Sequence, residues 1–188
     1  MRRVLVGGLV GAVVVIAWLF VADGILGFKR GIDTNRLGEE RIVYTFLAEH
    51  VTEPGRYVIN PELLPERRFP GEAPIFAVQY SGLGHKDAGQ EVIVGLVVAI
   101  LACVAGAWLL ANASGRILSR YYSRVLFLAA VGVVVALVTI LGRFGIAAYS
   151  LGDALALGLH DLAGWALAAL AIAAVVKPGG EQVTRTAG

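Results

Sequence analysis

The chain has 188 residues, of which 57% are hydrophobic and 16% charged, with a net charge of +2. Soluble domains average roughly 45–50% apolar and about 25% charged residues. The composition, with a mean hydropathy of +0.75, therefore excludes an ordinary soluble domain and indicates a membrane protein. Its few basic residues are scattered, which excludes a nucleic-acid partner. One cysteine, Cys103, cannot close an intrachain disulfide, and no zinc-type spacing is present, so we expect no metal site.

The first apolar run, Val4 to Ala22, follows two arginines at the start of the chain. It approaches the ~20 residues that span a bilayer and exceeds the roughly 7–15 of a signal-peptide core. No small-x-small cleavage site follows it, so we expect an uncleaved transmembrane helix. Gly7 and Gly11 form a small-xxx-small pair that would let another helix approach closely. The general frequency of glycine in membrane helices explains this pair equally well.

A polar insert is expected over residues 23–90. Apolar residues at helical spacing predict a helix over Gly38 to Val51. Alternation and β-branched residues predict two short strands, Arg56 to Asn60 and Ile75 to Tyr80. A lone two-stranded hairpin is only marginally stable in water, so we expect this small α+β unit to pack against the membrane helices or a partner.

Three further apolar runs follow the insert, over Val92 to Ala111, Val125 to Leu141 and Leu157 to Val176. The second of these is short, and residues 142–146 would extend it. Trp18 and other aromatic side chains near the ends of the runs are typical of an interfacial belt. The sequence thus predicts an α-helical membrane protein with four transmembrane helices and a small extracytoplasmic α+β insert between the first two.

The expected topology comes from the basic residues. After four crossings the start of the chain, the loop over residues 112–124 and the tail fall on one side, and together they carry most of the arginines near membrane ends. The positive-inside rule places that side in the cytoplasm. We therefore expect a multi-pass protein of the bacterial inner membrane with both termini cytoplasmic. Its parts are a first helix (1–22), a periplasmic insert (23–90), a three-helix membrane unit (91–177) and a cytoplasmic tail (178–188).

Three ionisable residues lie in or beside the last two apolar runs: Arg143, His160 and Asp161. Antiparallel threading would place them at a similar depth. Ionisable residues inside spans indicate functional sites, and Arg143 with Asp161 is the candidate pair. The simpler interpretation is an ion pair that holds two helices together, because an unpaired charge in the membrane is costly.

His160 is compatible with three roles: a polar residue at the wet interface, a proton-handling group, or an axial ligand to a haem or chlorophyll-type pigment. The membrane runs contain no second histidine, which excludes a bis-histidine haem within them. No HExxH motif, paired intramembrane carboxylates or glycine-framed serine is present, so we expect no catalytic residues and no enzyme. We accordingly expect no cofactor unless His160 ligates a pigment or haem.

Several short stretches carry a resemblance: Gly7-Gly8 and Trp18 in the first run, Pro54-Gly55-Arg56-Tyr57-Val58-Ile59-Asn60-Pro61 after the insert helix, and Asp161-Leu162-Ala163-Gly164-Trp165 in the last run. With these the chain resembles a family of uncharacterised bacterial four-span integral membrane proteins. It departs from the family at Gly27-Phe28-Lys29, where members carry Pro-Trp-His. The resemblance implies the four-span topology and no assigned activity.

We expect this chain to be a non-enzymatic accessory subunit of a larger membrane complex, of respiratory or photosynthetic type, with integral membrane proteins and lipids as partners. The expectation rests on glycine-containing spans suited to helix contact, an insert too small to be stable alone, and the missing catalytic motifs. The alternatives are a small-ligand or proton-handling protein that uses Arg143, His160 and Asp161, and a pigment- or haem-binding subunit that uses His160.

Overall fold

The computed structural model describes residues 1–33, 37–59, 76–82, 88–146 and 149–178. It divides into two units, one formed by Met1–Asp33 with Gln90–Gly188 and the other by Thr34–Gly89. Residues 23–33, which the sequence assigned to the insert, fall in the first unit. Each unit is described by itself.

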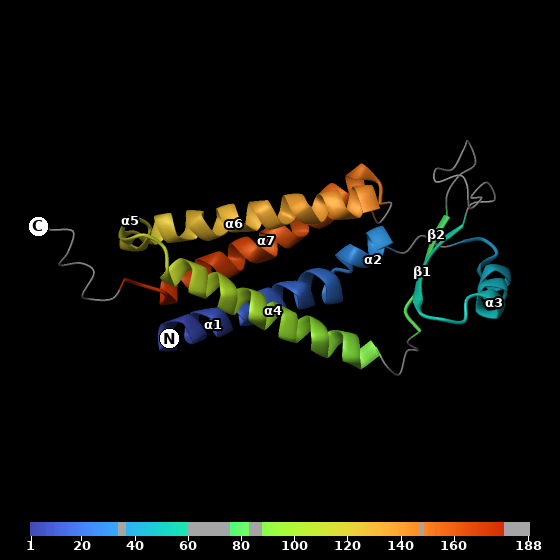
Figure 1. Cartoon of the computed structure of the whole chain (residues 1–188), viewed down its shortest axis with the longest axis horizontal. Helices are drawn as coiled ribbons and strands as arrows, with labels where there is room; N and C mark the ends of the chain where they lie inside the picture. The colour runs from blue at the N-terminus through green and yellow to red at the C-terminus, as the bar shows by residue number, and fades with distance from the viewer. Residues whose placement is uncertain (34–36, 60–75, 83–87, 147–148, 179–188) are drawn as a thin grey trace, which may run out of the picture. The chain divides into compact units, whose positions relative to one another are not determined.

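Four long helices build the first unit (Figure 1). Their bounds are α1 (Arg2–Leu19), α4 (Ala88–Ala111), α6 (Tyr121–Leu141) and α7 (Leu151–Val175). Two of them continue as short π-helices, α1 into η1 (Phe20–Ile25) and α6 into η3 (Gly142–Ile146). All four are long and apolar enough to cross a membrane, which confirms the prediction of four apolar spans.

The last helix, α7, is the most buried of the four and packs against both α1 and α6. Gly7 and Gly11 lie against it: a Cβ atom on Gly7 would stand 2.8 Å from Val176 Cγ2, and one on Gly11 would stand 2.6 Å from Ile172 Cγ1. Gly8 meets α4 instead, since a Cβ there would lie 2.6 Å from the Cα atom of Val104. The glycines of α1 thus bring its backbone close to two helices, as small residues do in membrane packing.

Two tryptophans fill spaces that glycines leave between the helices. The indole of Trp165 on α7 lies over Gly106 of α4 and Gly132 of α6, and its Nε1 donates a hydrogen bond to the Leu128 carbonyl oxygen at 2.7 Å. Trp18 of α1 lies over Gly164, where a Cβ would stand 2.7 Å from the ring. Trp18 therefore packs inside the first unit and is not simply a residue of an interfacial belt.

The fourth span begins earlier than expected. Ser150 is the N-cap of α7: its Oγ accepts a hydrogen bond from the Asp153 N–H at 3.1 Å and donates one to Asp153 Oδ2 at 2.7 Å. This cap satisfies a free amide of the first turn and starts the helix at Leu151. Residues 151–156, which precede the expected start of the fourth run at Leu157, are therefore helical, and His160 lies well inside α7.

The connection between α4 and α6 contains a short helix, α5 (Gly115–Ser119), which was not predicted. Arg124, on the first turn of α6, is 6% exposed. Its guanidinium donates to the carbonyl oxygens of Ala173 at 3.0 Å and of Leu118 at 2.6 Å. Ala173 lies in the last turn of α7, where free carbonyls and the helix dipole favour a cation. Arg124 is therefore a buried clamp: it holds α5, the start of α6 and the end of α7 together, and it is not an exposed loop residue.

The second unit contains α3 (Glu40–His50) and an antiparallel pair of strands, β1 (Gly55–Ile59) and β2 (Phe76–Tyr80). In their register Tyr57 lies opposite Val78. The predicted helix and hairpin are both present within one or two residues, although Asn60 and Ile75 lie outside the described residues. No described residue of α3 is buried.

Candidate functional site

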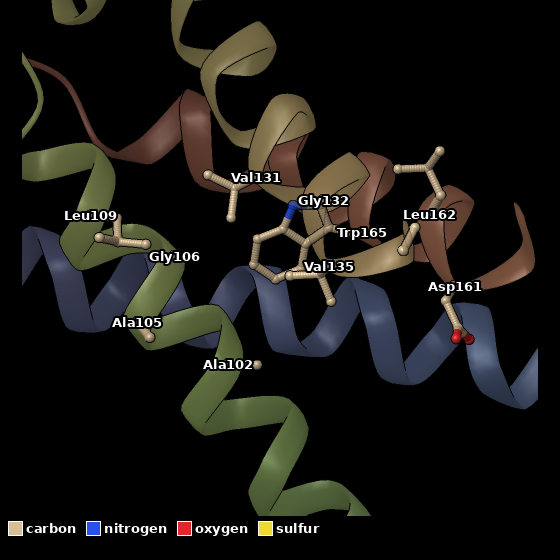
Figure 2. Close-up of a pocket in the computed structure, with 11 residues that line it drawn as sticks. Ala102, Ala105, Gly106, Leu109, Val131, Gly132, Val135, Asp161, Leu162 and Trp165 are labelled. Carbon is tan, nitrogen blue, oxygen red and sulfur yellow. The ribbon is translucent and has the colours of Figure 1, made fainter. Parts of the chain in front are cut away.

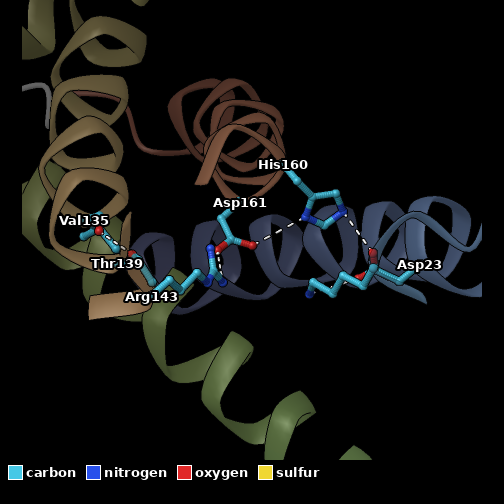
Figure 3. Close-up of polar contacts among 7 residues, drawn as sticks. Asp23, Val135, Thr139, Arg143, His160 and Asp161 are labelled. Carbon is cyan, nitrogen blue, oxygen red and sulfur yellow. Dashed lines mark hydrogen bonds and ion pairs between the residues drawn. The ribbon is translucent and has the colours of Figure 1, made fainter. Parts of the chain in front are cut away.

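Five ionisable side chains form a row at the end of the first unit where η1 and η3 lie (Figure 3). Its order is Lys29, Asp23, His160, Asp161 and Arg143. Lys29 Nζ lies 3.0 Å from Asp23 Oδ2, and the other oxygen of Asp23, Oδ1, lies 3.1 Å from His160 Nε2. His160 Nδ1 lies 3.4 Å from Asp161 Oδ1, and Asp161 Oδ2 accepts a hydrogen bond from Arg143 Nη2 at 2.8 Å. We call this set the charge row.

The histidine at the centre of the row is enclosed. Its side chain is 2% exposed, whereas the side chains of Asp23 and Asp161 are 22% and 33% exposed. The ring of Phe28 stacks on the imidazole with centroids 5.0 Å apart, and Trp18 lies at 5.4 Å in a tilted arrangement. Aromatic rings therefore shield His160, while carboxylates face its two nitrogens.

Four segments supply the row, and two of them are π-helical. Asp23 belongs to η1, Arg143 to η3, His160 and Asp161 to α7, and Lys29 to the short helix α2 (Phe28–Asp33). Gly27 precedes α2 with φ +67°, a conformation that glycine adopts without strain. π-helical turns are rare and frequently mark functional sites. In the described part of the chain, each of the two π-helices carries one charge of the row.

The row also holds polar atoms without hydrogen-bond partners. Among the described residues, the buried side-chain atoms in this state are Trp18 Nε1, Asp23 Oδ1, Arg143 Nη1 and His160 Nε2. All four belong to the row or to the tryptophan beside it. His160 Nε2 and Asp23 Oδ1 are within ion-pair distance of each other but are not aligned as a hydrogen bond. Buried polar atoms without partners cost free energy, and they are few in native proteins.

The structure brings together all three residues that the sequence singled out. Arg143 and Asp161 form the expected ion pair, and His160 adjoins it. Sequence reasoning missed Asp23 and Lys29, which it assigned to the insert. The available signal was that Asp23 directly follows the first apolar run, so antiparallel threading places it at the same end as Arg143 and His160.

The geometry bears on the other proposed roles of His160. Each ring nitrogen lies against a carboxylate oxygen, so an axial bond to a haem or pigment would have to displace Asp23 or Asp161. No group of three or more residues able to hold a metal ion occurs in the described part of the chain. The two carboxylate oxygens that face the ring nitrogens are groups that can accept hydrogen bonds from a doubly protonated imidazole.

Comparison with known proteins identifies no relative: no protein-family model, curated protein or solved structure matches this chain.

Proposed function

We propose that this chain is a non-enzymatic, proton-handling membrane protein in which His160 is the proton-binding group. The observation that carries the proposal is the placement of one shielded imidazole between two carboxylates, Asp23 and Asp161. The proposal develops the sequence-based alternative built on Arg143, His160 and Asp161, and adds Asp23 and Lys29 to it.

Hydrogen-bonding capacity supports this role. A neutral imidazole has one N–H donor and one acceptor nitrogen, whereas an imidazolium has two donors. Two ionised carboxylates both accept, so they match the imidazolium on both sides. Lys29 and Arg143 balance the charges of the two aspartates. Binding of one proton would therefore take the row from neutral to a single positive charge in apolar surroundings, a change large enough to affect packing.

The position of the row in the chain suggests what the proton controls. Phe28 and Lys29 contact His160 and Asp23, respectively, and both belong to α2, the last element before the second unit begins at Thr34. The charge of His160 would therefore affect how firmly α2, which leads into the second unit, is held against the helices of the first unit. We propose that the protein couples proton binding among its membrane helices to the insert.

The proposed setting is the inner membrane of a bacterium, with both termini cytoplasmic and the insert periplasmic. Two contacts support a common side for the basic ends. Arg3 Nη1 donates to the Pro178 carbonyl oxygen at 3.3 Å, and Arg124 joins α5, α6 and the end of α7. In this orientation the charge row lies toward the periplasm.

The test uses fluorotryptophan-labelled protein in mild detergent, followed by fluorine NMR over a pH titration. The Trp18 signal is assigned by its loss in Trp18→Phe. We expect this signal to titrate, because the indole and the His160 imidazole lie 5.4 Å apart. The step should disappear in His160→Gln and persist in His50→Gln, which removes an exposed histidine on α3. A Trp18 titration unchanged by His160→Gln would refute the proposal.

A second candidate is the accessory subunit of a larger membrane complex. The observation that favours it is the exposure of apolar side chains in the second unit: Ile42 is 66% exposed, Phe46 58% and Phe76 62%. Exposed apolar clusters often mark interaction sites. Purification from the native membrane in mild detergent, with comigrating proteins identified by mass, tests it. A reproducible assembly would support this candidate, and a lone particle would remove it. A Soret or near-infrared band in the same sample would support a pigment or haem.

A further inference from the structure

Five exposed cationic side chains lie at the end of the first unit where the N-terminus, α5 and the last turn of α7 are found (Figure 1). Three segments of the chain supply them: the start of α1, the connection from α4 to α6, and the residues that follow α7. The five are Arg2, Arg3, Arg116, Arg120 and Lys177. We call this set the basic end.

Hydrogen bonds hold the three segments of the basic end together. Arg3 Nη1 donates to the Pro178 carbonyl oxygen at 3.3 Å, which joins the start of α1 to the residues after α7. The buried Arg124 donates to the carbonyl oxygens of Leu118 in α5 and of Ala173 in α7. Cations that are far apart in the sequence therefore belong to one end of the folded unit.

The segments that build the basic end contain no carboxylate. No aspartate or glutamate occurs in residues 1–22, 92–152 or 162–180. Among the described residues, none of the five cations forms an ion pair. The next acidic residue after Lys177 is Glu181, and one carboxylate cannot balance five cations. The counter-charge of the basic end must come largely from outside the chain.

The opposite end of the first unit is electrically different. Lys29 is paired with Asp23 there, and Arg143 with Asp161. The pocket shown in Figure 2 has Asp161 as the one ionisable residue among those that line it, and Arg143 already neutralises that carboxylate. An anionic partner would therefore be attracted to the basic end and not to the charge row.

We propose that the basic end binds the head group of an anionic phospholipid, such as phosphatidylglycerol. The four long helices are apolar enough to cross a membrane, so their ends would lie at the depth of the lipid phosphates. Tyr122, at the start of α6, is 69% exposed, as is common for aromatic residues at a membrane interface. Clustered arginines and lysines at a membrane surface attract anionic lipids, and a guanidinium can bind two phosphate oxygens at once.

The proposal holds for either orientation of the chain in the membrane, and it is independent of the proton-handling role of His160.

The probe is dioleoyl phosphatidylglycerol, titrated into the full-length protein in an uncharged detergent. A lipid that binds the folded state raises the midpoint of thermal unfolding. We expect a saturable rise that weakens with added sodium chloride. Dioleoyl phosphatidylcholine has the same acyl chains and no net charge, and should give a much smaller rise. Sodium phosphate at the same concentrations should give none, because it lacks the acyl chains that hold a lipid beside the helices.

A matched pair of double variants locates the binding site. Arg116→Gln with Arg120→Gln removes two exposed charges from the basic end. The concentration of phosphatidylglycerol that gives half the rise should increase about tenfold to thirtyfold. Arg41→Gln with Arg56→Gln removes two exposed charges from the second unit and should leave that concentration unchanged. Arg2→Gln with Lys177→Gln is a second test of the basic end if the α5 variant does not fold.

Four outcomes would overturn the proposal. Equal effects of phosphatidylglycerol and phosphatidylcholine would show that charge plays no part. Equal weakening in the basic-end and second-unit variants would show general attraction between charges. A full effect of sodium phosphate would identify a site for free phosphate. Absence of a lipid effect, together with loss of a comigrating protein in Arg116→Gln with Arg120→Gln, would identify a protein partner.

Discussion

His160 Nε2 on α7 lies 3.1 Å from Asp23 Oδ1 on η1. This contact joins the first and last membrane helices through two side chains that are largely buried. Helix association in membranes depends on packing and on polar contacts, because lipid provides no hydrophobic drive between helices. The carboxylate of Asp23, through its charge contacts with Lys29 and His160, should therefore contribute to stability.

Asp23→Asn tests that contribution. The change removes the charge that faces both Lys29 and His160, so we expect the protein to lose about 1–3 kcal/mol of stability. The midpoint of thermal unfolding in detergent reports the loss. Glu49→Gln makes the same change from carboxylate to amide on the exposed surface of α3 and should have little effect. Equal midpoints for the two variants would show that the contact stabilises nothing.

Gly132→Ala tests the packing of Trp165. The added Cβ would overlap the indole ring, and overpacking of this kind costs about 1–3 kcal/mol. Gly95→Ala is the control, because no atom lies within 4 Å of its Cβ position and α4 is helical there. We expect Gly95→Ala to be neutral or stabilising by up to about 1 kcal/mol. Recovery of the unfolding midpoint when Gly132→Ala is combined with Trp165→Phe would identify the indole as the source of the clash.

Arg124→Gln and Arg120→Gln separate two effects: the loss of the buried Arg124 clamp and the loss of a positive charge at an exposed position. Both remove one positive charge at the start of α6, so their effects on membrane orientation should be alike. Arg124 is buried and loses hydrogen bonds to two carbonyl oxygens, which should cost about 3 kcal/mol. Arg120 is exposed, and its loss should cost little. Similar unfolding midpoints for the two variants would contradict the assignment of a clamp.

The proposed orientation predicts a labelling pattern. In a Cys103→Ala background, Thr45→Cys places a thiol on α3 and Ser119→Cys places one on α5, and both positions are exposed. A membrane-impermeant maleimide added to spheroplasts should label Thr45→Cys at once and Ser119→Cys only after lysis. The reverse pattern would invert the proposed topology, and labelling of both from outside would contradict the four crossings.

The four apolar spans were predictable because run length and missing charge determine which segments can cross a bilayer. The Arg143–Asp161 pair was predictable for a related reason: antiparallel neighbours bring the end of one span beside the start of the next. The start of α7 was missed, although Ser150 and Asp153 have the spacing of a capping box.

Other features depend on tertiary structure. Lys29 reaches Asp23 only because α2 follows a left-handed turn at Gly27, which hydropathy does not record. The burial of Arg124 was missed because the positive-inside rule counts a charge without locating its partners. Trp18 and Trp165 were recognisable as aromatic residues, but their pockets come from glycines on other helices. The resemblance to a four-span bacterial family stays a prediction.

The two π-helices give the charge row an unusual dependence on chain length. A π turn accommodates one residue more than an α turn, and one residue corresponds to about 100° of rotation around a helix. Deleting a single residue from η1 or η3 would restore ordinary winding there and rotate the side chains beyond it toward a different face. The position of these charged side chains therefore depends on the number of residues in each helix as well as on the identity of those residues.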